Sequence, residues 1–260
     1  MNFFFSISSE SINSNLIIPK FKNNGELNKS YDVFSAKIES EKWIIEKPDL
    51  ETNEYYFKIK QDFLDNEKIF FLAKDNEISL IKQKKNKELF SVNNYTDTEP
   101  AYRANLEICN NLGGFSSYQS EYPSNMIKVN SSVLTSLGSL TNFFAEKNIL
   151  IFRNIYFKPV KKQFDLIIFD ISNYKILDRV SVYTNKTNII NLDSKYLKEN
   201  IYLISLDYVG IPIFLSEKNG HLSFEHTHPP YHYIIGKNNF KIANQLKKNI
   251  YENIKKNNTI

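Results

Sequence analysis

Short apolar runs recur about every ten residues along the second half of the chain, and polar turn residues separate them. In the third run Ile176, Val180 and Val182 share one parity while polar residues occupy the other, which is typical of a half-buried strand. Turn signals such as Asn219-Gly220 lie between the runs. The pattern therefore predicts seven strands, at residues 149–157, 164–171, 175–183, 187–192, 200–207, 210–215 and 221–228.

Seven strands in about 80 residues is the count of an immunoglobulin-like β-sandwich, so we expect that fold in the C-terminal half. A looser pattern predicts a smaller N-terminal β unit, with strands at 31–38, 42–46, 55–60, 68–73 and 77–82. No linker rich in Pro, Ser or Gly separates the two halves, so they can pack as one body. The expected organisation is a β-rich unit at 1–97, a helix-and-loop connection at 98–148, and a sandwich with a C-terminal helix at 149–260.

Two helices are expected in this mainly β chain. The first covers 99–112, because Pro100 fits a first turn and Gly113 an end, and its apolar face makes Cys109 a core residue. The second covers about 239–256. Its apolar residues repeat with the helical period, at Ala243, Leu246, Ile250 and Ile254.

Composition and charge exclude several classes of protein. Hydrophobic residues make up 42% and charged residues 24% of the chain, as in folded globular proteins and unlike disordered ones. The net charge is +4, but residues 237–260 contain six Lys and one Glu, which leaves the rest of the chain close to neutral. Nucleic-acid binders carry a basic stripe on the folded body, so we expect no nucleic-acid partner.

A single cysteine, Cys109, excludes an intramolecular disulfide and a cysteine-based zinc cluster, and fits a reducing compartment. Residues 1–20 lack the basic and apolar regions of a signal peptide. No apolar run approaches the roughly 18 residues of a membrane span. We therefore expect a cytoplasmic protein with no membrane span.

Glycine, proline and histidine are concentrated in two windows of a chain otherwise rich in Asn and Lys. The first spans 113–138 and the second 210–236, and together they hold six of the seven glycines. All four histidines lie in the second window. Both windows are candidates for one site.

The second window has residues suited to a metal. In a strand, His226 and His228 point to the same face about 6.6 Å apart, and the following Pro-Pro turns the chain so that His232 can be a third ligand. Three histidines suit zinc, and imidazole with a carboxylate such as Glu225 suits iron. One alternative is a metal-free catalytic or ligand-binding site. The other is a structural cluster, in which the imidazoles bond backbone groups and stack on tyrosines.

The spacing Gly220-x5-His226-x-His228 resembles the first metal motif of the cupin family, and its His-x-His pair is similar to that on a strand of the α-type carbonic anhydrases. The resemblance covers about 17 residues. His232 stands where the cupins have a glutamate, so no family is assigned.

Other candidate ligand-binding residues lie in or near the first window. After Gly113-Gly114, the side chains of Ser116, Ser117 and Gln119 are suited to a phosphate or to sugar hydroxyls. The glycine pattern of a nucleophile elbow is absent around both serines. Arg153, in an apolar strand, is either an anion ligand or, as we favour, a buried ion-pair partner of Asp165 or Asp170.

Two functions follow as hypotheses. The first is a metal-dependent enzyme, using zinc or iron, that acts on a small polar or sugar-like substrate. His226 and His228 are then metal ligands, His232 is a third ligand or general base, Glu225 is an acid-base group, and His221 contacts the ligand. The second is a non-catalytic carbohydrate-binding or protein-interaction module with a structural histidine cluster.

Overall fold

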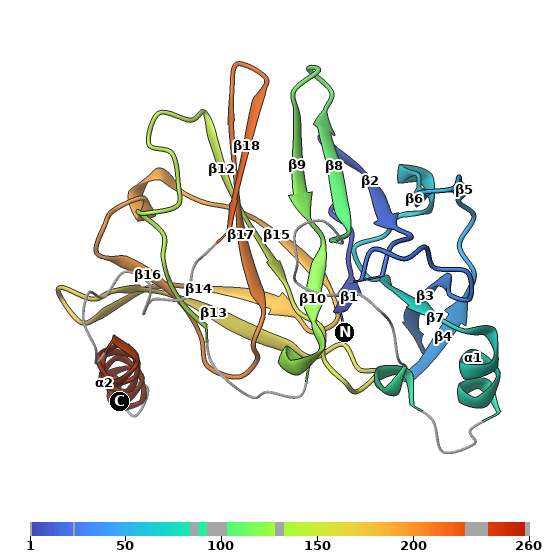
Figure 1. Cartoon of the computed structure of the whole chain (residues 1–260). Coiled ribbons are helices and arrows are strands. Elements are labelled where there is room, and N and C mark those ends of the chain that lie inside the picture. Colours follow the sequence, from blue (N-terminus) through green and yellow to red (C-terminus); the bar gives the residue numbers. More distant parts are fainter. Residues whose placement is uncertain are drawn as a thin grey trace.

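The structure, a computed structural model, describes residues 2–22, 24–83, 88–92, 103–127, 133–226 and 239–257. It is mainly β. Four small antiparallel sheets form it, and they are arranged in the manner of a four-bladed β-propeller (Figure 1). Each half of the chain contributes two of the sheets.

The N-terminal half forms two five-stranded sheets. The first has the strand order β10 (Glu121–Pro123), β1 (Asn2–Phe4), β7 (Ile69–Ala73), β3 (Asp32–Glu39) and β4 (Lys42–Glu46). The second has the order β5 (Glu51–Thr52), β6 (Tyr56–Ile59), β2 (Ile12–Pro19), β8 (Asn105–Asn110) and β9 (Phe115–Gln119). This half is therefore not the smaller unit that the sequence pattern predicted.

The C-terminal half forms two four-stranded sheets. The third sheet has the order β15 (Thr187–Asn191), β12 (Lys147–Arg153), β17 (Ile211–Lys218) and β18 (His221–His226). The fourth has the order β11 (Val133–Ser136), β16 (Ile201–Ser205), β13 (Gln163–Asp170) and β14 (Lys175–Tyr183). All seven strands predicted in this half are present.

The immunoglobulin-like sandwich is nevertheless wrong. That fold places strands A, B, E and D in one sheet and C, F and G in the other. Here the first, fourth, sixth and seventh predicted strands share the third sheet, and the second, third and fifth share the fourth sheet with β11. The packing differs too, because both faces of each of these sheets contribute residues to a hydrophobic core.

Strand β12 shows how the third sheet is covered. Ile149 and Ile151 belong to the main core with the N-terminal sheets, whereas Leu150 and Phe152 belong to a second core shared with the fourth sheet. A continuous apolar run is typical of a strand buried on both faces. The two halves therefore pack as one body through this strand.

Helix α2 (Asn239–Asn257) confirms the predicted C-terminal helix. Its buried residues Ile250 and Ile254 form a third core with Ile167, Phe169 and Ile204 of the fourth sheet. The helix thus covers the outer face of that sheet (Figure 1). No helix in the part of the chain that the structure describes is both long and apolar enough to cross a membrane.

The helix predicted at 99–112 is wrong over its described part, where β8 lies instead. Leu106 and Ile108 are fully buried on one face of β8, and Glu107 and Cys109 are half-exposed on the other. This alternation favours a strand, so Cys109 is not the core residue that a helical face required.

The strand predicted at 77–82 is also wrong, because helix α1 (Asp75–Lys82) occupies it. Glu77 caps the helix by accepting a hydrogen bond from the backbone N–H of Lys74, at 3.1 Å. Short 3-10 turns complete the described elements, at Gln61–Phe63, Leu89–Ser91, Ser124–Met126 and Ser194–Tyr196.

Candidate functional site

The structure places a strand from the first window, 113–138, beside a strand from the second window, 210–236. Strand β9 is the edge of the second sheet and β18 is the edge of the third, and the two strands lie beside each other (Figure 1). The rings of Tyr118 and Phe224 are 6.3 Å apart across this seam. The seam joins segments that are more than a hundred residues apart in sequence.

The inner faces of the two strands pack against the core, and Ser116 shares the inner face of β9 with Tyr118, whereas Ser117 and Gln119 lie on its other face. Ser117, His221 and Glu225 are exposed, and Ser116 and Gln119 are half-buried. Gln119 accepts a hydrogen bond from the guanidinium of Arg103. Ligand binding by these residues stays a prediction.

The histidine cluster predicted at 221–232 is not formed by the residues that the structure describes. His226 ends β18 and is described only by its backbone, and His228 and His232 lie outside the described residues. Among the residues that are described, no group of three His, Cys, Asp or Glu side chains is placed to hold a metal. Binding of zinc or iron stays a prediction.

Arg153 has neither of the carboxylate partners that the sequence suggested. Its side chain is fully buried and donates hydrogen bonds to the carbonyl oxygens of Asn66, at 2.6 Å, and Lys68, at 3.2 Å, and to the hydroxyl of Thr187, at 3.2 Å. Burial lowers the pKa of Arg153 to about 9. Arg153 thus ties the loop at 66–68 to the third sheet.

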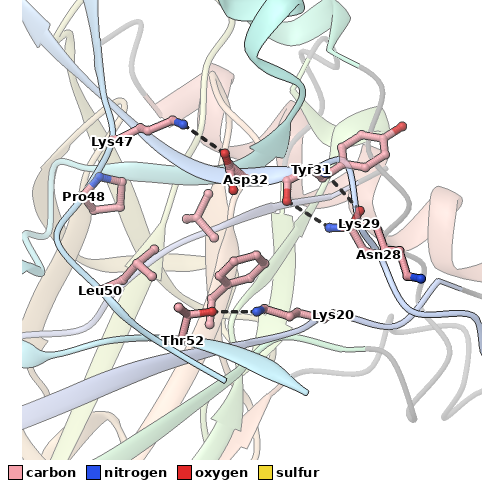
Figure 2. Close-up of a pocket in the computed structure, with 11 residues that line it drawn as sticks. Lys20, Asn28, Lys29, Tyr31, Asp32, Lys47, Pro48, Leu50 and Thr52 are labelled. Atoms are coloured by element: carbon pink, nitrogen blue, oxygen red, sulfur yellow. Dashed lines mark hydrogen bonds and ion pairs between the residues drawn. The ribbon is translucent and has the colours of Figure 1, made fainter. Parts of the chain in front are cut away.

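A different site lies where the first and second sheets meet. It is an open pocket of about 360 Å³, a volume within the usual range for small-molecule sites (Figure 2). Its lining comes from the segment after β2, the start of β3, the segment after β4, and strands β5 and β6. The lining residues are Lys20, Asn28, Lys29, Tyr31, Asp32, Val33, Lys47, Pro48, Leu50, Thr52 and Phe57.

The pocket has an apolar floor and a polar rim. Val33 and Phe57 are almost fully buried, and Leu50 packs against the same core. Lysine, aspartate and threonine side chains surround this floor in Figure 2. Such a combination is common in ligand sites, where apolar contacts supply area and a few polar groups fix orientation.

The loop that forms one wall is ordered by Asn28. Its buried side chain accepts hydrogen bonds from the backbone N–H groups of Ser30 and Tyr31, each at 3.0 Å, and donates one to the carbonyl oxygen of Tyr31, at 3.0 Å. An asparagine side chain that bonds its own loop in this way fixes a turn. The wall is therefore preformed.

The rim carries more positive than negative charge, with three lysines and one aspartate. Lys47 Nζ lies 2.9 Å from Asp32 Oδ2 and 3.0 Å from Asp75 Oδ1. Its hydrogen bonds with Asp32 and then with Asp75 raise the pKa of Lys47. Lys47 therefore remains protonated and has two carboxylate partners.

The other two lysines are differently placed. Lys20 Nζ donates a hydrogen bond of 2.6 Å to Thr52 Oγ1 and lies 4.5 Å from the ring centre of Phe57. Lys29 is exposed and forms no ion pair with any residue that the structure describes. Lys20 and Lys29 thus present positive charge that no carboxylate of the described lining offsets.

Sequence reasoning missed this pocket for a physical reason. Its polar residues come from separate segments, and most of them are Lys, Asn or Asp in a chain where such residues are common. Only the pairing of β2 with β6 and of β3 with β4 brings them together. No motif of fixed spacing marks the set.

Comparisons with known proteins add no relative: no family model, no curated protein and no solved structure matches the chain.

Proposed function

We propose that this protein is a binding module for a small anionic molecule that carries hydroxyl groups, such as an acidic or phosphorylated sugar. The observation that carries the proposal is the pocket of three lysines and one aspartate around an apolar floor. This is the carbohydrate-binding alternative of the sequence analysis, placed at a different site.

The chemistry of the rim supports an anion with hydroxyl groups. Lys29 and Lys20 supply ammonium groups for a carboxylate or phosphate, and hydrogen bonds between charged groups are the stronger ones. The carboxylate of Asp32 is half-exposed and accepts hydrogen bonds from hydroxyl groups. Leu50, which is partly exposed, offers an apolar surface to the C–H face of a sugar ring.

Binding is favoured over catalysis at this pocket by the groups that line it. The described lining contains no histidine and no cysteine, and its aspartate is already paired with Lys47. The enzyme hypothesis depends on His226, His228 and His232, for which the described residues provide no supporting contact. The pocket therefore supports recognition without a reaction.

Isothermal titration calorimetry with glucose 6-phosphate, glucuronate and glucose tests the proposal. We expect the two anionic sugars to bind with a dissociation constant on the order of 0.1 mM, and glucose to bind at least about tenfold more weakly. Inorganic phosphate alone is expected to bind more weakly than glucose 6-phosphate, because it lacks the contacts of the ring.

Two variants test whether the anionic sugar binds in this pocket. Lys29→Ala removes an exposed ammonium group without touching the core, and we expect it to weaken binding of glucose 6-phosphate about tenfold. Lys162→Ala, an exposed lysine beside the fourth sheet, is the matched control and leaves binding unchanged. Equal affinity of Lys29→Ala and the unmodified protein, or no binding of either anionic sugar, refutes the proposal.

A further inference from the structure

The most exposed large apolar side chains that the structure describes all lie on two turns at one end of the molecule. Leu112 and Phe115, in and beside the β8–β9 turn, are 74% and 65% exposed. Phe143 and Phe144, in the segment before β12, are 60% and 79% exposed. Large apolar groups left in water at one place mark an interaction surface.

The β17–β18 turn connects these two segments. Leu112 packs beside Gly220, and the backbone N–H of Asn219 donates a hydrogen bond of 3.3 Å to Glu146 Oε1. Lys218 Nζ lies 5.9 Å from the ring centre of Phe144. The three turns therefore form one surface, which we call the tip surface. The β8–β9 and β17–β18 hairpins both project at this end in Figure 1.

The hairpins of the tip surface have defined conformations. Asn219 and Gly220 both have positive φ, 49° and 79°, as the two-residue turn between antiparallel strands requires. The side chain of Asn110 accepts hydrogen bonds from the backbone N–H groups of Leu112, at 3.1 Å, and Gly114, at 2.8 Å. Ordering these turns on binding therefore has little entropic cost.

We propose that the tip surface binds a lipid membrane by inserting its apolar side chains into the interfacial layer. An aromatic side chain has roughly 150–250 Å² of surface. Because the four side chains are 60–79% exposed, together they expose about 500 Å². A stable protein interface needs about 800 Å² on each partner. Projecting side chains of this limited area fit a fluid lipid surface better than a second protein.

The charge of the tip surface identifies the kind of lipid. Residues 110–115, 142–147 and 217–221 contain two glutamates and two lysines, so they have no net charge with His221 neutral. Anionic lipids attract clusters of basic residues, and no such cluster is present in these three segments. The surface is therefore suited to zwitterionic phosphatidylcholine, and insertion depends on apolar burial.

Vesicle co-sedimentation with pure phosphatidylcholine tests this inference, which is independent of the sugar-binding proposal. We expect the protein to pellet with the vesicles, with partitioning that changes less than about twofold when phosphatidylserine or salt is added. The double variant Phe143→Ser/Phe144→Ser is expected to reduce partitioning at least about tenfold. Leu112→Ser/Phe115→Ser is expected to act in the same direction.

A matched control and a fluorescence probe separate insertion from other causes. Leu177→Ser replaces an exposed leucine on β14 and is expected to bind vesicles like the unmodified protein. Phe144→Trp is expected to show a blue-shifted emission on addition of vesicles and quenching by brominated phosphatidylcholine. Thermal unfolding of each variant confirms that the fold is retained.

Three results overturn the inference. One is a protein that stays in the supernatant at all phosphatidylcholine concentrations. Another is equal partitioning of the tip variants and the Leu177→Ser control. The third is a dimer in solution that the Phe143→Ser/Phe144→Ser variant converts to a monomer, which would make the tip surface a contact between copies of this chain.

Discussion

The side-chain amide of Asn110 donates a hydrogen bond of 2.9 Å to the backbone carbonyl oxygen of Gly220, which joins the turns of two hairpins from different sheets. The same amide lies 3.3 Å from Glu217 Oε1. Asn110 and Gly220 are both buried, so loss of this hydrogen bond would leave a buried polar group without its partner. This residue therefore connects the second sheet to the third.

Replacement of Asn110 by alanine is expected to lower the free energy of unfolding by about 2 kcal/mol, because the buried carbonyl oxygen of Gly220 loses its donor. Urea unfolding followed by circular dichroism measures the change. Asn111→Ala, at an exposed position next in sequence, is the control and is expected to cost less than about 0.5 kcal/mol. Similar losses for both variants would contradict the assigned role of Asn110.

The two adjacent glycines of the β8–β9 turn are expected to respond differently to alanine. A Cβ on Gly114 would lie 1.9 Å from the carbonyl oxygen of Gly220, whereas a Cβ on Gly113 meets open space. Gly113→Ala is therefore expected to cost about 1 kcal/mol, from its positive φ alone. Gly114→Ala must push the hairpins apart, and we expect at least about 2 kcal/mol. Equal urea midpoints for the two variants would show that the hairpins do not touch at this point.

Arg153 is expected to tolerate methionine better than lysine. Lysine keeps a buried positive charge but has no planar fork to reach Asn66, Lys68 and Thr187 together, so we expect a loss of about 3 kcal/mol. Methionine removes the charge as well as the hydrogen bonds, and we expect a smaller loss. Urea unfolding of both variants tests this order, and a more stable lysine variant would contradict it.

Asp170 is expected to make the free energy of unfolding depend on pH in the acidic range. A hydrogen bond from the Asn173 side chain, together with those from the backbone of residues 172 and 173 and from Asn200, lowers the pKa of Asp170. A carboxylate with a lowered folded pKa stabilises the protein fully above its unfolded value of about 3.9, and this contribution is lost as the pH falls through the folded pKa. Asp170→Asn is therefore expected to be less stable by about 2 kcal/mol at neutral pH, with a difference that shrinks toward pH 3.

Urea midpoints measured at several pH values test the Asp170 prediction, with Asp49→Asn as an exposed control. A difference between Asp170→Asn and the unmodified protein that stays constant from neutral to acidic pH would contradict it. The control is expected to show no loss at neutral pH, because Asp49 is exposed and the described residues give it no hydrogen bond.

Sequence patterns predicted the strands of the C-terminal half that are buried on both faces, such as β12 and β17, but missed β2 and β8, whose residues alternate between buried and half-buried. The seven strands predicted in the C-terminal half and helix α2 are present, whereas β11 (Val133–Ser136) was not predicted. The short segment at β8 fits both a helical face through Leu106 and Cys109 and the strand alternation of Leu106 and Ile108, which is why the helix predicted there is wrong. Of the candidate site, the sequence placed none of the pocket residues and suggested carboxylate partners for Arg153 that it does not have.

The sequence by itself determined helix α2 and seven strands of the C-terminal half, because the period of apolar residues depends only on neighbours a few positions away. Tertiary structure alone decided which strands share a sheet, since that choice depends on burying both faces of β12 between cores from distant segments. It also decided the pocket and the tip surface. Their residues come from turns and strands far apart in sequence, and only the packing of the four sheets makes them neighbours.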